Sequence, residues 1–455
     1  MDVNKLNKTE WQAGISLASV YVLRMLGLFM VIPVLAVAAL EYPDYSPLWV
    51  GLAVGGYGLT QAICQIPMGL LSDSWGRKPV IYIGLILFAL GSLIAGLADS
   101  MWLLTIGRIM QGSGAIAAAV MALASDATRE SQRTKIMALI GISIGFSFYL
   151  ALLLGPIVAA SLGLSGIFLM TAILAILCVP LVHFGVQLPE NLQASGDSLP
   201  KTKSLWSLYK HHHLWRLNLS VLVIHMLVTC FFVQVPVQLI NMSVPLSEHW
   251  IVYTIVLSVS VLALIVMINL SDKLPVSTSA SIALLCLAVS FVILLTNANN
   301  WTGIVIAGIF FFAGFNFLEA KMPSMVSAIC PPGQKGSAMG LYASHQFFGA
   351  FLGGLVSGLL NSFFSPQYTF IMCLVVIFLL SLTMKGLANI ERIKRVTLML
   401  GDTGVTMNTN ASILNELRGL AGVKEALIDD IDDAIYLKVD AKLFDIEQAK
   451  QIIKH

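Results

Sequence analysis

The chain has 455 residues, of which 57% are hydrophobic and 11% are charged, and its mean hydropathy is +0.86. Soluble domains carry about 25% charged residues, so a water-soluble core cannot absorb this much apolar sequence, and most of the chain should lie in lipid. The net charge of +2 says little about partners, among which we expect no nucleic acid. The six cysteines lie far apart without C-x-x-C spacing, so we expect small buried hydrophobic residues, not disulfides or a zinc site.

Twelve apolar spans of membrane length follow one another along the chain. They cover residues 13–39, 48–71, 79–98, 101–124, 134–160, 166–186, 214–240, 249–270, 277–296, 301–328, 336–362 and 368–386. Segments this long in lipid must be helices, because only helices and closed barrels satisfy the backbone there and barrel strands are shorter. The sequence therefore predicts an all-α polytopic membrane protein.

Basic residues predict the orientation of these spans. The even-numbered loops and the segments around them carry Arg77, Lys78, Arg129, Arg133, Lys135, Lys201, Lys203, Lys210, Arg216, Lys273, Lys335, Lys385, Arg392, Lys394 and Arg395. The opposite loops hold Glu41, Asp44, Asp99 and Glu248 and no Lys or Arg. By the positive-inside rule, both termini should be cytoplasmic.

A polar stretch at 187–213 divides six spans from six, which gives an N-terminal half at 1–186 and a C-terminal half at 214–386. The two halves resemble each other in sequence. Gln132–Leu139, which leads into span 5, aligns with Gln334–Leu341, which leads into span 11. Two six-helix repeats in the same orientation predict an axis along the membrane normal, with binding at the midplane between the halves.

The composition changes after a linker at 387–394. Residues 395–400, 410–419, 423–428, 434–439 and 445–453 read as strand, helix, strand, strand and helix. This βαββα order predicts a small cytoplasmic α+β domain at 395–455, close to the ferredoxin-like order without a clear fourth strand. Its Asp-rich turn at 429–433 is either a solvent-exposed acidic turn or a cation site. The domain has a possible cytoplasmic ligand or partner, which the sequence does not identify.

The charged loop between spans 2 and 3 contains the chain's most distinctive motif. Gly69 allows close approach of a neighbouring helix, and Gly76 permits a tight turn. Asp73 can face the positive end of another helix, and Arg77 can pair with a carboxylate. Alternatively, Arg77 and Lys78 only fix the topology.

These residues resemble the major facilitator superfamily. The loop matches the family's motif A, a Gly, an Asp and then Gly-Arg-Lys, at Gly69, Asp73 and 76–78. Residues 108–114 of span 4, Arg-Ile-Met-Gln-Gly-Ser-Gly, resemble motif B, and Gly155-Pro156 matches part of motif C of the antiporter branch. The resemblance implies the two-half fold with twelve transmembrane helices, a bacterial inner-membrane location and transport by alternating access.

The resemblance also implies a conformational latch. In it, Asp73 would face the start of span 11 near Gly336, and Arg77 would pair with Asp126 at the cytoplasmic end of span 4. Together with Gly69, Gly76 and Lys78, these bonds would hold the cytoplasmic side shut and give an outward-facing state. Breaking them would permit rocking to the other state.

Charges inside spans are costly and mark functional candidates. This chain has Arg24 in span 1, Arg108 in span 4, and Glu319 and Lys321 in span 10. Glu319 is the one acid well inside a span, which favours it as proton carrier. The alternative is a structural pair with Arg24, Arg108 or Lys321.

Histidines add further candidates. His225 in span 7 and His345 in span 11 lie at a depth similar to that of Glu319 and can titrate, or can serve as packing residues. The three histidines at 211–213 fit a cytoplasmic interface tract better than a metal site. Drug antiporters of the family often have an acid in span 1, where this chain has Arg24. Its positive charge therefore favours anionic or zwitterionic cargo as much as cationic drugs.

The sequence predicts a non-enzymatic, proton-coupled efflux antiporter for a small molecule, without cofactor or metal and monomeric in the bilayer. No Walker A pattern occurs, so the chain should not be its own ATPase. A proton symporter or facilitator for a polar metabolite is the alternative within transporters. A membrane sensor with a signalling C-terminal domain is the alternative of another class.

Overall fold

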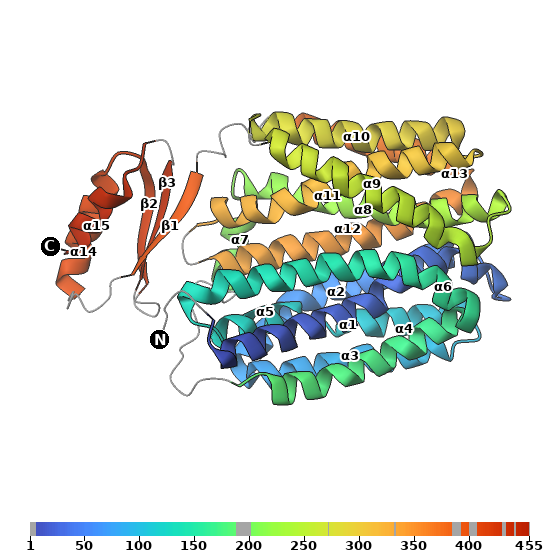
Figure 1. The fold of residues 1–455 in the computed structure, drawn as a ribbon, viewed down its shortest axis with the longest axis horizontal. Helices are drawn as coiled ribbons and strands as arrows, with labels where there is room; N and C mark the ends of the chain where they lie inside the picture. Colours follow the sequence, from blue (N-terminus) through green and yellow to red (C-terminus); the bar gives the residue numbers. More distant parts are fainter. Residues whose placement is uncertain are drawn as a thin grey trace.

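The structure, a computed structural model, describes residues 6–187, 202–271, 273–331, 334–384, 393–399, 407–429, 434–440 and 443–454. Long helices lie side by side in one bundle, and a small sheet with two helices lies beyond one end of it (Figure 1). We call this end of the bundle the domain end and the opposite one the far end. The first helix, α1 (Lys8–Ala38), begins at the domain end (Figure 1), as an even number of crossings requires.

The first half of the bundle contains the helices α1 (Lys8–Ala38), α2 (Pro47–Trp75), α3 (Arg77–Gly96), α4 (Met101–Ser113), α5 (Ala117–Asp126) and α6 (Glu130–Gly185). Span 4 was expected as one helix, but the chain leaves helical geometry at Gly114, with ψ of 49°, and divides it into α4 and α5. Spans 5 and 6 are joined in α6, where only Gly163 is non-helical, with φ of 67°. Glycine adopts this conformation without steric cost, so the chain reverses without a polar loop.

The second half contains α8 (Leu214–Asn241), α9 (His249–Ser271), α10 (Val276–Asn297), α11 (Trp301–Ile329), α12 (Lys335–Phe363) and α13 (Pro366–Met384). Ten helical stretches of the described chain are long and apolar enough to cross a membrane. The 29-residue α2 and the second leg of α6 bring the crossings to the predicted twelve. A short helix, α7 (Thr202–Tyr209), lies in the segment between the halves, which the sequence indicated only as polar.

Glycines bring the two halves into close contact. Two G-x-x-x-G patterns face each other, Gly51 and Gly55 on α2 and Gly354 and Gly358 on α12. A Cβ atom on Gly55 would lie 2.8 Å from the carbonyl oxygen of Phe351, and one on Gly358 would lie 2.8 Å from that of Pro47. Because these glycines lie in the far-end part of both helices, the backbones of α2 and α12 touch there.

The C-terminal domain contains β1 (Ile393–Met399), α14 (Met407–Gly419), β2 (Val423–Asp429), β3 (Ala434–Asp440) and α15 (Ile446–Lys454). The element order is the predicted one, with β1 beginning two residues before 395. The three strands form an antiparallel sheet in the order β1-β3-β2. The ferredoxin-like assignment stays a prediction. Most of the linker and of the Asp-rich turn lies outside the described residues.

The sheet of this domain has one face toward its helices and the other toward the bundle (Figure 1). Along β3, Ile435, Leu437 and Val439 pack against α14 and α15 in the domain core. Lys438 lies on the opposite face, yet it is only 6% exposed, and its Nζ donates to the carbonyl oxygen of Ile329 at 2.9 Å. The domain therefore docks on the last turn of α11.

Candidate functional site

The loop between α2 and α3 forms a compact cluster of polar side chains at the domain end. Gly76 separates the two helices with φ of 95°, a value that favours glycine, so α3 starts at the next residue. This turn directs the Arg77 side chain, 8% exposed, back over the end of α2. There Nη1 donates to Ser72 Oγ at 2.9 Å and forms an ion pair with Asp73.

Arg77 also links this polar cluster to α5. Its Nε donates to Asp126 Oδ2 at 3.0 Å, which is the pair that the motif implied. The second carboxylate oxygen of Asp126, Oδ1, is buried without a hydrogen-bond partner. The Lys78 Nζ donates to the carbonyl oxygen of His183 in α6 at 3.2 Å. One loop thus joins α2, α3, α5 and α6 within the first half.

The implied contact from Asp73 to the start of α12 is absent from this structure. Among the described residues, Asp73 pairs with Arg77 alone. Gly69 is buried in α2, and its carbonyl accepts from Ser72 Oγ at 2.7 Å. At this end, α2 and α12 approach less closely than at the far end: a Cβ on Gly340 would find only Ile66, at 3.9 Å.

Arg24 lies in the interior of the first half, only 2% exposed. Its Nη2 donates to the carbonyl oxygen of Gly114 at 2.9 Å, and its guanidinium lies 5.0 Å from the Phe88 ring centroid. At the break between α4 and α5 this carbonyl also accepts from Ile116 N at 3.0 Å, so Arg24 bonds α1 to the backbone between these two helices. The atoms Nε and Nη1 of Arg24 are buried without partners, so the charge is only partly satisfied.

Arg108 forms a second buried cationic centre, also 2% exposed. It donates to the carbonyl oxygen of Ala53 at 3.1 Å and to Gln111 Oε1 at 2.8 Å, and Gln111 donates to Ser92. Its guanidinium lies 5.1 Å from the Tyr57 ring centroid. Among the described residues, neither Arg24 nor Arg108 pairs with a carboxylate, so the interior of the first half is positively charged.

Glu319 of α11 lies in a cluster within the second half. Its Oε1 accepts from Gln346 Nε2 of α12 at 3.2 Å, and its Oε2 lies 3.8 Å from His225 Nε2 of α8. Gln346 Nε2 also lies 2.7 Å from His225 Nε2. The Glu319 side chain is 36% exposed, although Oε2 itself is buried without a partner.

The neighbours of His225 indicate its tautomer. Because the Gln346 amide nitrogen can only donate, His225 Nε2 acts as the acceptor and the ring proton lies on Nδ1. Nδ1 in turn lies 3.1 Å from the carbonyl oxygen of Val221, which accepts this proton. The arrangement places the His225 imidazole beside the Glu319 carboxyl group, with the Gln346 amide bridging the two.

The other sequence candidates lie outside this cluster. Lys321 lies two positions beyond Glu319 on α11, about 200° around the helix, and forms no pair with it. His345 Nδ1 contacts the carbonyl oxygen of Leu341, and its ring stacks on Tyr209 of α7 at a centroid distance of 6.1 Å. Within the described chain, no group of three or more His, Cys, Asp or Glu is placed to hold a metal ion.

Sequence reasoning missed two residues of this region, Gln346 and Tyr149. Gln346 is uncharged and follows His345, so only the rotation of α12 decides which of the two reaches Glu319. Tyr149 OH of α6 accepts from Asn316 Nδ2 of α11 at 2.6 Å, which joins the two halves near the cluster. Phe148 beside it lies 6.2 and 6.3 Å from the rings of Phe312 and Phe315.

Two six-helix halves, buried arginines in the first, a carboxylate within a span of the second and a polar loop at one end define a membrane transporter of the two-repeat class. The family model of the Major Facilitator Superfamily matches residues 17–275 and 246–395, and the chain belongs to this family. The resemblance drawn from the motifs is thereby confirmed.

Known proteins similar to the chain include the inner membrane transport protein YajR of Escherichia coli (strain K12). The two are 38% identical, and the match covers 99% of each chain. A tetracycline resistance protein, class B, of Escherichia coli is 30% identical over 38% of this chain and 44% of its own length. Among solved structures, an inward-facing, occupied bacterial homologue of the human lysosomal transporter Spinster matches 84% of this chain and 97% of its own, with a TM-score of 0.64 and 14% identity. That likeness concerns the fold alone.

Proposed function

We propose that the chain exports a small molecule by alternating access and couples this export to protons that move the opposite way. The observation that carries the proposal is the cluster of Glu319, Gln346 and His225 on three helices of the second half. A carboxylate inside a membrane span is retained where it is functional, because its burial is costly. Its partial exposure supplies the access that a proton carrier needs.

The geometry supports a simple exchange at this cluster. A proton reaching Glu319 neutralises the carboxylate and weakens the hydrogen bond that Oε1 accepts from Gln346, because charge-assisted bonds are the stronger ones. Gln346 then keeps only its bond to His225. Since Glu319, Gln346 and His225 lie on α11, α12 and α8, protonation changes the contacts among three helices at once. Protonation of Glu319 is a local change of charge that shifts the balance between two arrangements of these helices.

The latch supplies the second part of the cycle. The N-half bonds of Arg77 to Ser72, Asp73 and Asp126 form one rigid unit. We propose that Asp73 reaches the first turn of α12 when the domain end closes, and that this structure, with α2 and α12 touching at the far end, represents the opposite state. Asp73→Asn should then shift the resting state while leaving folding intact.

That shift is measurable as the accessibility of a single cysteine introduced at each end of the bundle. The expected result is more labelling at the domain end, because the outward-facing state loses its bond to α12. Equal accessibility in Asp73→Asn and the parent would contradict the latch. Ser74→Asn, an exposed neighbour whose hydroxyl bonds only Leu71 in its own helix, serves as the matched control.

The cationic interior of the first half supports an anionic or zwitterionic cargo. Arg24 and Arg108 lack carboxylate partners among the described residues, and both approach Tyr57, whose ring lies 6.1 Å from Phe347 of the other half. A negatively charged group near this interface would be stabilised by the positive field in a low-dielectric medium. We propose a bacterial inner-membrane location with both termini cytoplasmic and a monomeric assembly.

Transport by proteoliposomes tests the proton coupling. We expect an imposed pH gradient to drive flux in the parent and Glu319→Gln to lose this pH-driven part, because the amide cannot exchange the proton. Glu248→Gln, in a far-end loop, is the matched control and should retain it. Retained pH-driven flux in Glu319→Gln would exclude Glu319 as carrier.

The same assay separates the alternatives. Flux that is unaffected by the gradient would identify a facilitator, and flux that runs with the proton would identify a symporter. The absence of flux, with ligand binding retained, would favour a sensor whose C-terminal domain signals. A thermal-shift screen against metabolites and drugs, anions included, provides the substrate for these measurements.

A further inference from the structure

The short helix α7 is unlike the other helices of the bundle. Leu208, fully buried, anchors it to the core of the second half, whereas Trp206 and Tyr209 are 68% and 51% exposed. Burial in the core does not account for these two large aromatic side chains, because more than half of each is exposed. They stack on each other instead, with centroids 6.0 Å apart and planes 6° from parallel.

Positive charge accompanies these rings. Lys210 Nζ lies 4.9 Å from the Trp206 ring centroid, and the Arg216 guanidinium lies 5.0 Å from that of Trp215, itself 38% exposed. From residue 198 to residue 247 the sequence has four Lys or Arg residues and no acid. The surface formed by Trp206, Tyr209, Lys210 and Trp215 is therefore aromatic and cationic. We call it the α7 surface.

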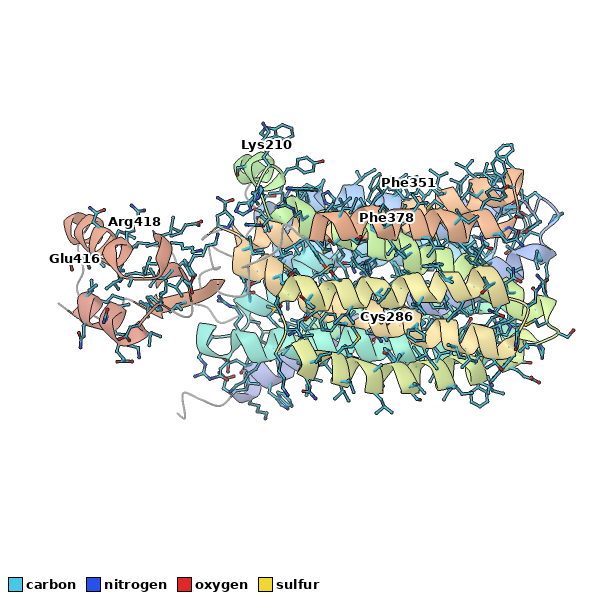
Figure 2. The ribbon with its side chains drawn as sticks, turned by 90° about the horizontal axis from the view of Figure 1, so that it is seen from above. Lys210, Cys286, Phe351, Phe378, Glu416 and Arg418 are labelled. Carbon is cyan, nitrogen blue, oxygen red and sulfur yellow. The ribbon has the colours of Figure 1, made fainter. Side chains whose placement is uncertain are left out.

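The position of the α7 surface fits the edge of a bilayer. Figure 2 shows the helix that ends beside Lys210 next to the bundle, near the end that faces the C-terminal domain. The apolar outer side of the bundle continues from there, with Leu379 and Leu382 of α13 both more than half exposed. Trp and Tyr concentrate at this depth in membrane proteins, where a ring can lie among headgroups.

We propose that α7 is an interfacial helix that binds the headgroups of anionic phospholipids in the cytoplasmic leaflet. The aromatic pair would lie at the boundary between acyl chains and headgroups, and Lys210 would contact the lipid phosphate. This helix type combines an apolar face with basic residues and lies in the membrane plane. The proposal rests on the proposed orientation of the chain but not on proton coupling, so its failure leaves the transport proposal intact.

A nucleic acid or acidic protein could also use basic and aromatic residues, but a lipid is favoured by continuity with the apolar belt. Tyr209 moreover stacks on His345, the neighbour of Gln346 on α12. Lipid bound at the α7 surface would thus hold α7 against the helix that bridges Glu319 and His225. Lipid binding at the α7 surface could in this way be coupled, through α7 and α12, to the cluster of Glu319, Gln346 and His225.

Fluorescence quenching in nanodiscs tests the contact directly. The full chain is placed in phosphatidylcholine nanodiscs with a minor fraction of either brominated phosphatidylglycerol or brominated phosphatidylcholine. The Trp206 signal is the difference between the parent and Trp206→Phe. A lysine near an anionic surface enriches such lipid about fivefold, so quenching of Trp206 should be stronger with phosphatidylglycerol.

Two lysine variants give the test its specificity. Lys210→Gln should lose the preference for the anionic lipid, whereas Lys273→Gln, an exposed lysine in the α9–α10 loop, should keep it. Equal quenching of Trp206 by both lipids would overturn the proposal, because no headgroup selectivity would exist. Equal quenching by both lipids together with a change in Trp206 fluorescence on adding a soluble oligonucleotide would overturn it in favour of nucleic acid.

Discussion

Arg77 is the single residue on which most of the domain-end contacts of the first half depend. It is 8% exposed and bonds Ser72, Asp73 and Asp126, which belong to α2 and α5. Removing one partner of a buried ion pair leaves the other charge uncompensated, and this costs more than the pair itself contributes. Asp126 already has one unsatisfied oxygen and would lose the bond to the other.

We therefore expect Arg77→Gln to lower the free energy of unfolding by about 3 kcal/mol. Lys78→Gln, the adjacent change, should cost less than about 1 kcal/mol, because its lysine makes one exposed hydrogen bond to His183. Thermal unfolding in detergent measures both. The double variant Arg77→Met/Asp126→Leu should recover much of the loss. Equal unfolding temperatures for the two single variants would contradict the role of Arg77.

At this scale the sequence predicted one side-chain contact and left another undetermined. The motif indicated the pair of Arg77 and Asp126, and the structure contains it. Glu319 was expected either as a proton carrier or in a pair with Arg24, Arg108 or Lys321. Its neighbours are Gln346 and His225, and not one of these three cations, because side-chain contacts between helices depend on helix rotation, which a single sequence leaves undetermined.

Among the elements, α12 has a distinctive composition, with two faces of small residues. Gly354 and Gly358 meet α2, while a Cβ on Gly353 would lie 2.8 Å from the Thr229 side chain of α8. Small residues let backbones approach where lipid provides no hydrophobic drive. The helix thus packs tightly against its own half and, at the far end, against the other half.

This packing predicts the effect of a larger residue on α2. In Gly55→Val the side chain would meet the backbone of Phe351, which cannot move aside, so the far ends of α2 and α12 should separate. Spin labels at Leu48→Cys and Leu359→Cys would report a longer distance. Gly141→Val, where a Cβ meets nothing within 4 Å, is the control. An unchanged distance in Gly55→Val would show that this contact does not close the far end.

The spans themselves could be predicted because long apolar runs mark most of them, and the twelve-helix fold is confirmed. The breaks within the spans could not be predicted from hydropathy. Gly112, Ser113 and Gly114 mark the break in span 4, but only the bond from Arg24 to the Gly114 carbonyl shows why the chain leaves the helix there. α7 was missed because eight residues give too weak a periodic signal.

At the scale of the whole molecule, the C-terminal domain docks on the helix bundle. Lys438 Nζ bonds the Ile329 carbonyl at the end of α11 at 2.9 Å and Glu425 at 3.0 Å. A cation at a helix C-terminus is stabilised by the exposed carbonyls and the helix dipole. The sequence predicted the domain but not this contact, since a contact between separately folded units has no local pattern. The helix that carries Glu319 is thus tied to the domain.

His211, in the turn before α8, is close to this contact and makes it sensitive to pH. Burial lowers the pKa of His211 below its ordinary 6.5, and the charges of Lys438, His213 and His212 lower it further, against the opposing effect of Glu425. When the domain undocks, the Lys438 charge leaves His211, so the pKa of His211 would rise toward its ordinary value and the ring would bind more protons. Docking should therefore be strongest above about pH 6.5 and weaken as the pH falls through the interval down to the lower, docked pKa.

We expect spin labels at Lys450→Cys on α15 and Lys273→Cys in the α9–α10 loop to give a narrow distance distribution at about pH 7.5 and a broader one at about pH 5.5. His211→Asn should abolish this pH dependence, because asparagine does not titrate, whereas His212→Asn, an exposed neighbour, should retain it. Lys438→Met should broaden the distribution at both pH values, since the bond to Ile329 is lost. If the distribution of the parent is the same at both pH values, His211 does not control docking. If Lys438→Met stays narrow, the lysine does not hold the domain on α11, and the remaining contacts of the sheet face are sufficient.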